Sequence, residues 1–575
     1  MTSADSSVRP AFAALAAAPR AEVLVIGGGV NGLAVFRDLA LQGVEVVLVE
    51  RGDFAGGASA ASSHMIHGGI RYLENGEFRL VHEAVTERND LLRTAPHYVR
   101  PLQTTIPIFA TFSGVLGAPF RFLRHGQGRR AERGAILIKI GLVIYDSFSR
   151  GGGRVPAHAF HARRRSLQTQ PDLNPAVKYT ATYWDGSLVD PERLALDVLT
   201  DALRDGGSRV RAANYVEAVD ARDGLVVLRD AETGVEVPFA ASVVVNASGP
   251  WTDVTNAALE QPTRYMGGTK GSHIVLDHPE LLAATRGREM FFEHRDGRIV
   301  LIYPLRGRVL VGTSDLEHDM SEPILCTEAE VDYFLGLIGH VFPRIPVSRE
   351  QIVHRFSGVR PLPGHGDLAP GFVSRDYRVE ETEVLGSAGR TRLVSVIGGK
   401  WTTFRALGER VTDDVLAILR RPRTATTRHR PIGGGAGFPR TERARQQWVA
   451  EQARGAVPRE RVAVLLERYG TRAAAVIAAI GADPADAPLG SAPGYSTGEL
   501  RHLAATEHVV HLEDLLLRRT GLAFQGQATP EAAAEVAAAV APVLSWDAAR
   551  VEAEVARALR AVRAAYPAPA SPVPA

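Results

Sequence analysis

The N-terminal part of the chain contains residue types that can bind a nucleotide pyrophosphate. Gly27, Gly29 and Gly32 form a G-x-G-x-x-G pattern within EVLVIGGGVNGLAVFRDLALQGVEVVLVE, which ends in Glu50. Glycines at this spacing let the backbone approach a pyrophosphate at a helix N-terminus. A carboxylate that follows the next strand can accept hydrogen bonds from ribose hydroxyls. The pattern therefore predicts a dinucleotide site.

The elements around these residues have the order that such a site requires. Residues 22–26 are typical of a β-branched strand, residues 31–41 have helical spacing of apolar side chains, and residues 44–49 indicate a second strand. A lone glycine pattern is a weak signal, so this strand, turn, helix and strand context makes the prediction specific.

The sequence after Glu50 indicates which dinucleotide fits. RGDFAGGASAASSHMIHGG is rich in Gly, Ala and Ser and does not continue the alternating sheet typical of nicotinamide enzymes. The strand-to-turn pattern recurs where strand 242–245 is followed by NASG, and where strand 393–397 is followed by Gly398 and Gly399. Three such turns far apart in the chain predict a discontinuous nucleotide domain, which favours FAD over NAD.

Composition limits the remaining classes of function. The 575 residues are 45% hydrophobic, enough for several domains, and 66 basic residues nearly balance 64 acidic ones, so nucleic acid is not an expected partner. The single cysteine, Cys326, excludes an internal disulfide, leaves no thiol cluster for a metal and fits a reducing cytoplasm. We expect Cys326 to be inert rather than a covalent flavin anchor. No apolar run reaches 18 residues, so no spanning helix is expected.

Several motifs in order along the chain resemble one known family, the FAD-dependent, quinone-linked glycerol-3-phosphate dehydrogenases. They include IGGGVNG, SSHMIHGGIRYLENGEFRLVHEAVTERNDLL, IGLVIYDSFS, VVVNASGPWTD, KGSHIVL, VGTSDLEHD, FSGVRPL, SRDY and IGGKWTTFRALGE. The resemblance extends from Ala21 to about Phe524, where ELRHLAATEHVVHLEDLLLRRTGLAF is similar to the family's helical cap.

The resemblance implies an activity. It is the oxidation of sn-glycerol 3-phosphate to dihydroxyacetone phosphate by hydride transfer from C2 to N5 of non-covalent FAD, with electrons passed to quinone. His273 would act as the base and Arg360 would stabilise the developing alkoxide, while Arg71, Tyr72, Arg375 and Lys400 would bind the substrate. The residues implied to bind the cofactor are Gly27, Gly29, Asn31, Gly32, Glu50, Ser62, Ser63, His67, Gly68, Gly69, Val216, Ala247, Gly249, Gly399, Lys400, Thr402 and Thr403.

These residue types suit the implied substrate. A dianionic phosphate ester needs fixed cationic donors, and planar guanidinium groups match phosphate oxygens well. A base with a pKa near neutrality suits removal of the alcohol proton, which favours a histidine. For each residue an ordinary structural role stays open, because lone arginines are usually surface charges and a histidine before a strand, such as His273, can be a capped surface residue. His64, His67 and His82 are not assigned catalytic roles.

The expected fold class is α/β plus α, with a discontinuous Rossmann-like FAD-binding domain, an antiparallel-sheet substrate domain and a C-terminal all-helical domain. The FAD-binding domain is predicted over residues 21–95, 185–260 and 390–420, and the substrate domain over 96–184 and 261–389. The remaining predicted segments are a disordered arm at 1–20, a linker at 421–437, a helical domain at 438–565 and a disordered tail at 566–575.

Residues 112–148 mix arginines with aromatic and aliphatic residues, which fits either a segment on an anionic membrane or a core helix with a basic loop. The resemblance favours peripheral attachment to the inner face of the cell membrane, and a second copy of the chain is a further candidate partner. Three alternatives stay open: an oxidase that produces hydrogen peroxide, an amino-acid or amine oxidase, and a flavoprotein without catalytic activity.

Overall fold

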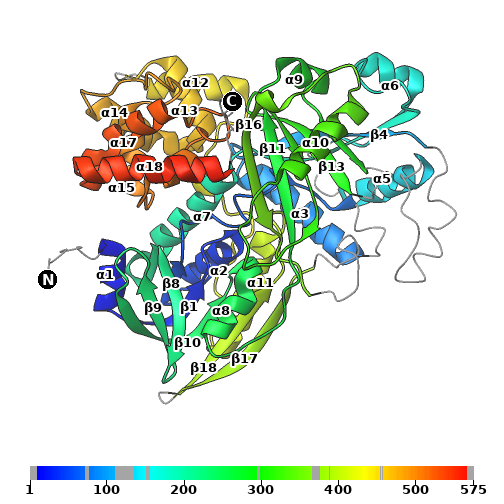
Figure 1. Cartoon of the computed structure of the whole chain (residues 1–575). Helices are drawn as coiled ribbons and strands as arrows, with labels where there is room; N and C mark the ends of the chain where they lie inside the picture. The colour runs from blue at the N-terminus through cyan, green and yellow to red at the C-terminus, as the bar shows by residue number, and fades with distance from the viewer. Residues whose placement is uncertain are drawn as a thin grey trace, which may run out of the picture. The chain divides into compact units, whose positions relative to one another are not determined.

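The computed structural model describes residues 9–70, 77–110, 135–149, 156–293, 298–364, 376–386, 389–453, 455 and 457–565. The chain divides into two compact units, each assembled from three separate stretches (Figure 1). The first unit comprises Met1–Ala60, Pro191–Thr269 and Val359–Ala436. The second unit comprises Ala61–Asp190, Lys270–Gly358 and Gly437–Ala575.

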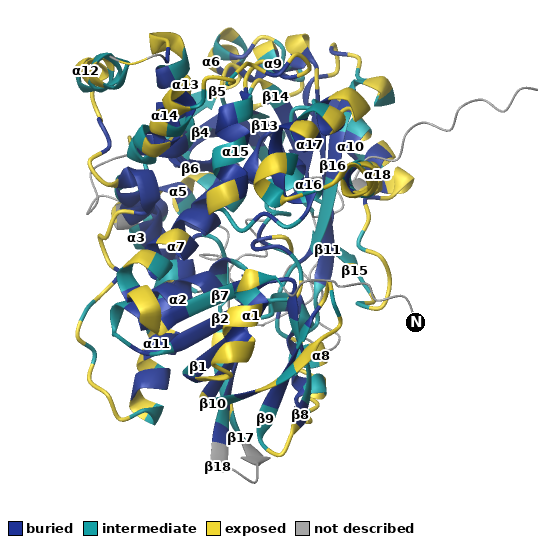
Figure 2. Ribbon diagram, turned by 90° about the vertical axis from the view of Figure 1, so that its left-hand side faces the viewer, coloured by how far each residue is buried: buried dark blue, intermediate teal, exposed yellow. Residues whose placement is uncertain are grey.

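Across the described residues of the first unit, eight strands form one sheet. Strands β18, β10, β1, β2 and β7 lie side by side and run parallel, and β17 adds an antiparallel edge. Central strands such as β1 are largely buried, as Figure 2 shows, which fits their continuous apolar sequences. The strands are β1 Arg20–Ile26, β2 Val46–Glu50, β7 Val210–Asn214, β8 Val216–Arg222, β9 Leu225–Asp230, β10 Glu236–Asn246, β17 Arg378–Gly386 and β18 Gly389–Ile397.

Helices cover this sheet, and α2 packs against both α7 and α11. Their bounds are α1 Pro10–Ala17, α2 Val30–Leu41, α7 Pro191–Gly206, α8 Thr252–Ala258 and α11 Phe404–Ile418. Helix α1 lies where the sequence predicted a disordered arm. Its Phe12 and Leu15 are buried in one cluster with residues of β1 and β2, so two large side chains stabilise an otherwise alanine-rich segment.

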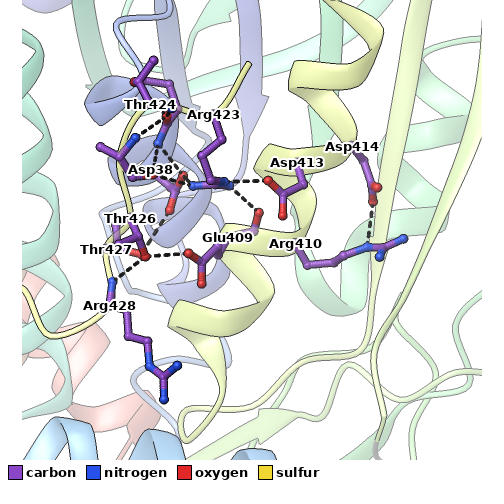
Figure 3. A network of polar contacts seen from close by, with 12 residues as sticks. Asp38, Glu409, Arg410, Asp413, Asp414, Arg423, Thr424, Thr426, Thr427 and Arg428 are labelled. Carbon is purple, nitrogen blue, oxygen red and sulfur yellow. Dashed lines mark hydrogen bonds and ion pairs between the residues drawn. The ribbon is translucent and has the colours of Figure 1, made fainter. Parts of the chain in front are cut away.

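The predicted linker is fixed to the first unit by a polar network (Figure 3). The guanidinium of Arg423 donates to the carboxylates of Asp38 on α2 at 2.7 Å and of Asp413 on α11 at 2.6 Å. The Thr427 hydroxyl donates to the other oxygen of Asp38 at 3.0 Å. Because Asp38 is fully buried, these donors compensate a charge that water cannot reach.

Within the described part of the second unit, ten strands form a sheet that is antiparallel except where β12 runs parallel to β4. This arrangement, together with the parallel sheet and the C-terminal helices, confirms the predicted fold class. The strands are β3 Met65–Ile66, β4 Val99–Ile108, β5 Ala159–Ala162, β6 Tyr179–Leu188, β11 Thr269–Leu276, β12 Glu289–Glu293, β13 Ile299–Leu305, β14 Arg308–Gly312, β15 Leu316–Glu317 and β16 Ile352–Val359.

The helices of the second unit fall into two sets. Those beside the sheet are α3 Phe78–Thr94, α5 Ala135–Ser149, α6 Arg163–Thr169, α9 Pro279–Thr285 and α10 Glu328–Val341. The C-terminal set shares its own buried core and consists of α12 Glu442–Gln452, α13 Arg459–Tyr469, α14 Ala473–Ala482, α15 Thr497–Thr506, α16 Leu512–Asp514, α17 Pro530–Leu544 and α18 Ala548–Ala565.

Helix α5 has apolar side chains on two sides. Leu142 and Tyr145 are buried against α3 and the sheet, whereas Ile136, Ile140 and Val143 are exposed. The buried side shows that α5 belongs to the core, and the exposed side leaves an apolar stripe on the surface. The rest of the basic segment that precedes α5, residues 111–134, lies outside the described residues.

Among the described helices, none combines the length and the apolar character that crossing a membrane would require.

Glu289 gives the sheet of the second unit a dependence on pH. Burial raises the pKa of this carboxyl to about 8, although the Thr104 hydroxyl donates to it at 2.8 Å. The unfolded chain ionises this residue at lower pH than the folded chain does, so folding loses stability as pH rises from about 4.5 towards 8. The loss is complete above the folded pKa.

We therefore expect the free energy of unfolding of Glu289→Gln at pH 8 to exceed that of the unchanged protein by at least about 1 kcal/mol, so that it unfolds at a higher temperature. Its melting temperature should also vary less between pH 5 and pH 8, as thermal unfolding followed by circular dichroism would show. Glu552→Gln, on the exposed side of α18, is the matched control. Parallel pH profiles for Glu289→Gln and the unchanged protein would contradict the assignment.

Candidate active site

The predicted glycine turn lies at the C-terminal end of β1, where backbone segments approach each other closely. Gly27 has φ of +110°, and a Cβ atom there would lie 2.6 Å from the Ala247 carbonyl oxygen. A Cβ atom on Gly32 would lie 1.9 Å from the Gly27 carbonyl oxygen. Side chains are therefore excluded at Gly27 and Gly32, on either side of the start of α2. A helix N-terminus beside such a glycine turn can bind a pyrophosphate.

Glu50 ends β2 beside this turn, as predicted. Its carboxylate accepts hydrogen bonds from the backbone N–H of Gly28 at 2.7 Å and of Gly52 at 2.9 Å. Burial raises the pKa of Glu50, and these two hydrogen bonds oppose that effect. Each carboxylate oxygen can accept more than one hydrogen bond, so Glu50 can bond the backbone of the turn and also accept hydrogen bonds from ribose hydroxyls.

Two further backbone segments of the first unit reach the same turn. The Ser59 hydroxyl accepts from the Val30 N–H at 2.9 Å, and the Ser59 carbonyl accepts from the Trp401 indole at 3.0 Å. The Asn31 side chain donates to the Gly398 carbonyl at 3.3 Å. The glycine turn after β1, the loop at Ser59 and the segment after β18 are therefore joined by hydrogen bonds. The segment after β10 joins them through the Ala247 N–H, which donates to the Ile26 carbonyl at 2.9 Å.

Buried oxygen atoms at this edge fit a bound cofactor. Asn31 Oδ1 and Thr403 Oγ1 are buried, and neither has a hydrogen-bond partner in the part of the chain that the structure describes. Unpaired buried polar atoms are costly in a folded protein. Partners supplied by a ligand with many polar groups, such as a flavin dinucleotide, would remove this cost, so these residues fit FAD.

The other predicted cofactor residues of the first unit differ in their surroundings. Gly249 begins a 3₁₀ turn after β10, and the Lys400 carbonyl accepts from the Thr403 N–H at 3.2 Å. Thr402 is buried beside Thr403 at the start of α11. Val216 lies within the apolar core on β8. Its side chain is therefore explained by packing, and a cofactor role for it stays a prediction.

In the second unit, the structure joins two predicted residues that are far apart in sequence. The Ser63 hydroxyl oxygen lies 2.9 Å from Nε2 of His273, which is on β11. The imidazole stacks on Phe356, with 4.8 Å between the ring centroids. A Cβ atom on Gly312, opposite His273 on β14, would lie 2.2 Å from the imidazole, so the ring covers that glycine. Three neighbours thus fix the ring.

A buried polar cluster supports the strand that carries His273. The preceding residue, Ser272, donates to Glu330 at 2.8 Å, and Lys270 forms an ion pair with the same carboxylate at 2.8 Å. Although burial would raise the pKa of Glu330, hydrogen bonds from Lys270, Ser314 and Thr327 lower it to about 2. The carboxylate therefore stays charged near neutral pH and holds β11 and the start of α10 together.

The histidines of the loop before β3 and of α3 have structural surroundings. His64 is buried with Nδ1 3.1 Å from the Leu188 carbonyl, and burial lowers its pKa to about 4, so it is neutral at physiological pH. His82 is exposed on α3. Cys326 is also buried, and a raised thiol pKa disfavours the reactive thiolate, which supports the expectation that it is inert. Burial raises the pKa of Cys326 to about 12.

The predicted cationic residues are only partly described. Arg360 follows β16, and its backbone N–H donates to the Thr269 carbonyl at 2.9 Å. Thr269 is the first residue of β11, four positions before His273. The predicted substrate residues Arg71, Tyr72 and Arg375 lie outside the described residues.

Sequence reasoning missed several residues that hold these turns. Ser59 and Trp401 lie in segments that were identified, but nothing in their spacing indicated that they bond each other. It also missed Asp185 on β6, whose Oδ1 accepts from the Gly68 N–H at 3.0 Å. Asp185 precedes a glycine in YWDGS, which reads as an ordinary turn.

Comparisons with known proteins agree with this geometry. Residues 22–413 match the family described as FAD dependent oxidoreductase, and residues 425–551 match the C-terminal domain of alpha-glycerophosphate oxidase. A glycerol-3-phosphate dehydrogenase from Synechocystis is 31% identical over 88% of this chain and 89% of its own length. A D-erythritol 1-phosphate dehydrogenase from Brucella abortus is 33% identical over 87% of this chain and 94% of its own length.

The crystal structure of a Bacillus halodurans glycerol-3-phosphate dehydrogenase complexed with FAD has the same fold. It is 23% identical, covers 97% of both chains and superposes with a TM-score of 0.72.

The contacts of Gly32 predict a loss of cofactor on substitution. We expect Gly32→Ala to be purified with less than about a tenth of the yellow chromophore of the unchanged protein, because its Cβ cannot fit beside the Gly27 carbonyl. The absorbance ratio at 450 and 280 nm measures this. Gly336→Ala is the control, since Gly336 is exposed on α10 with open space around it. A Gly32→Ala protein with full flavin content would contradict the predicted pyrophosphate site.

Proposed function

We infer the function of this chain from its family, because it belongs to the FAD-dependent glycerol-3-phosphate dehydrogenases, within the FAD-dependent oxidoreductases. We propose that it oxidises sn-glycerol 3-phosphate to dihydroxyacetone phosphate. The observation that carries the proposal is the family match, which extends through both compact units and is accompanied by the glycine turn that Glu50 ties.

Bound FAD would supply the two-electron chemistry by accepting a hydride from C2 of the substrate. The residues of the chain would bind and orient the substrate and manage its proton. His273 would take the proton of the C2 hydroxyl, which requires a neutral imidazole. The hydrogen bond between Ser63 and Nε2, together with the stacked Phe356, supports this role because both restrict rotation of the ring.

The cationic residues would select a phosphorylated substrate. We propose that Arg360 stabilises negative charge on the C2 oxygen. We also propose that the substrate is bound by Arg71, Tyr72, Arg375 and Lys400, and that the three cationic residues of this set hold its phosphate. A zwitterionic amino acid has one carboxylate and would leave most of these cationic groups without a matching anion, so an amine oxidase is a weaker candidate.

The carbon-chain length of the preferred phosphate ester must also be chosen, because one relative is named for D-erythritol 1-phosphate. That compound has the same phosphate ester on a chain that is one carbon longer. We propose glycerol 3-phosphate as the preferred substrate because the Synechocystis relative and the Bacillus halodurans structure carry that name. Comparing flavin reduction by the two esters would test the choice.

We propose that electrons pass from the flavin to quinone at the inner face of the cell membrane. The exposed side of α5 supports this, since Ile136, Ile140 and Val143 form an apolar stripe with the Lys139 ammonium beside it. Apolar and cationic side chains on one helix suit an anionic membrane surface. The alternative acceptor is molecular oxygen, which the match to the alpha-glycerophosphate oxidase C-terminal domain favours.

Arg360→Ala should keep its flavin but lose at least about a hundredfold in the rate of anaerobic flavin reduction by glycerol 3-phosphate, because a charged donor to the transition state is removed. Stopped-flow absorbance at 450 nm measures this rate. Arg392→Ala, which removes an arginine on β18 that pairs with Glu381 at the sheet edge, should be unaffected. A near-normal rate in Arg360→Ala would remove this residue from the site.

His273→Ala should slow flavin reduction at neutral pH and recover part of the rate at alkaline pH, where hydroxide can replace the missing base. The pH profile of the reduction rate measures this, with His82→Ala on the exposed side of α3 as the control. If both variants and the unchanged protein share one profile, the base is another residue.

The acceptor is tested by mixing the protein, after anaerobic reduction by glycerol 3-phosphate, with either oxygen or a soluble quinone. We expect reoxidation by quinone to be at least about tenfold faster at equal acceptor concentration, with little hydrogen peroxide formed. Stoichiometric peroxide and no response to quinone would instead establish an oxidase. Absence of flavin reduction by glycerol 3-phosphate would contradict the proposed substrate itself.

A further inference from the structure

A fully buried carboxylate lies beneath the turn that contains Gly68. Asp185 is on β6, and its Oδ1 accepts from Arg88 at 2.9 Å, from the Tyr145 hydroxyl at 2.6 Å and from the Gly68 N–H at 3.0 Å. The side chains of Arg88 and Asp185 are 0% and 1% exposed. One oxygen atom therefore joins α3, α5 and the backbone that follows β3.

The turn is fitted closely to this network. The Gly68 N–H also lies 3.1 Å from the Tyr145 hydroxyl oxygen. A Cβ atom on Gly68 would lie 2.2 Å from that oxygen and 2.7 Å from a methyl group of Val85. The preceding strand β3 has only two residues, Met65 and Ile66, paired with β6. The position of the turn therefore depends on Asp185 and Tyr145 more than on the sheet.

Stability alone is a poor explanation for this ion pair. Removing an arginine and a carboxylate from water costs several kcal/mol per ion, and apolar residues of similar size often stabilise a core as well or better. The remaining donors of Arg88 are also satisfied, by the Asn89 side chain at 3.1 Å and the Trp184 carbonyl at 3.1 Å. A buried network in which each guanidinium nitrogen of Arg88 has a partner holds its members in one arrangement.

We propose that Asp185, Arg88 and Tyr145 are positioning residues that hold the backbone of His67, Gly68 and Gly69 in its reactive position. The inference rests on the proposed function and on the sequence prediction that His67, Gly68 and Gly69 are among the residues that bind FAD. None of the three positioning residues would touch the reacting atoms. Their effect would pass through the Gly68 N–H, so that its loss displaces the turn and slows the reaction without releasing FAD.

The test separates positioning from simple stability. Asp185→Asn removes the negative charge that faces the buried guanidinium of Arg88, so it should lower both the melting temperature and the rate of flavin reduction. The triple variant Arg88→Met/Tyr145→Phe/Asp185→Leu removes the buried charges and the Gly68 acceptors together. We expect it to melt above Asp185→Asn and to keep its flavin, but to be reduced by glycerol 3-phosphate about 10- to 100-fold more slowly than the unchanged protein.

Glu554→Gln is the matched control. Glu554 is a buried carboxylate of the same unit, bonded at 2.9 Å to His511 in the C-terminal helices. This variant should lose stability and keep its rate of flavin reduction. If the rate of the triple variant instead recovers together with its melting temperature, the network is only structural and the proposal is overturned.

Hydrogen exchange of the Gly68 amide gives a readout that needs no substrate. The amide should exchange slowly in the unchanged protein and at least about tenfold faster in the triple variant and in Tyr145→Phe/Asp185→Asn, which serves if the triple variant does not fold. Equal exchange would overturn the proposal even if glycerol 3-phosphate is not the substrate. Failure of glycerol 3-phosphate to reduce the unchanged protein would contradict only the proposed function.

Discussion

Close contact between backbone segments at the C-terminal ends of β1, β10 and β18 is the constraint on which the first unit depends. Parallel strands bring these ends to one edge of the sheet, and Gly27, Gly32 and Ala247 are small enough to let the chains meet there. Because the edge consists mainly of backbone N–H groups and carbonyls, the ligand it suits is large, polar and phosphorylated. The class of cofactor is therefore indicated by the backbone groups that these small residues leave accessible.

Buried charges in both units serve to hold loops rather than to react. Asp38 fixes the segment that follows α11, Glu50 ties the glycine turn, and Glu330 supports the strand that carries His273. In each case the carboxylate accepts at least one hydrogen bond from a segment more than 20 residues away. Such pairs contribute little net stability, but they penalise any arrangement in which a donor is lost. They therefore favour one arrangement of the segments that they join.

The sequence predicted the parts of this molecule that depend on local pattern. Gly27, Glu50 and the strands around them were read from spacing alone, and the order of motifs indicated FAD and the three-part fold. Contacts such as Ser63 with His273 could not be predicted, because no pattern records which distant residues meet. The alanine-rich composition of residues 1–20 left disorder and a loose helix as alternatives, and Phe12 and Leu15 fold α1 against the core.

The edge strand β17 has a consequence for how this protein behaves in concentrated solution. Its sequence RVEETEVLG places several charged side chains along an open row of backbone hydrogen-bonding groups, and Arg392 of β18 pairs with Glu381 and Glu383 on it. A strand from another molecule that docked there would have to desolvate these charges, which opposes edge-to-edge aggregation. The charged side chains of β17 therefore disfavour the addition of a further strand at this edge of the sheet.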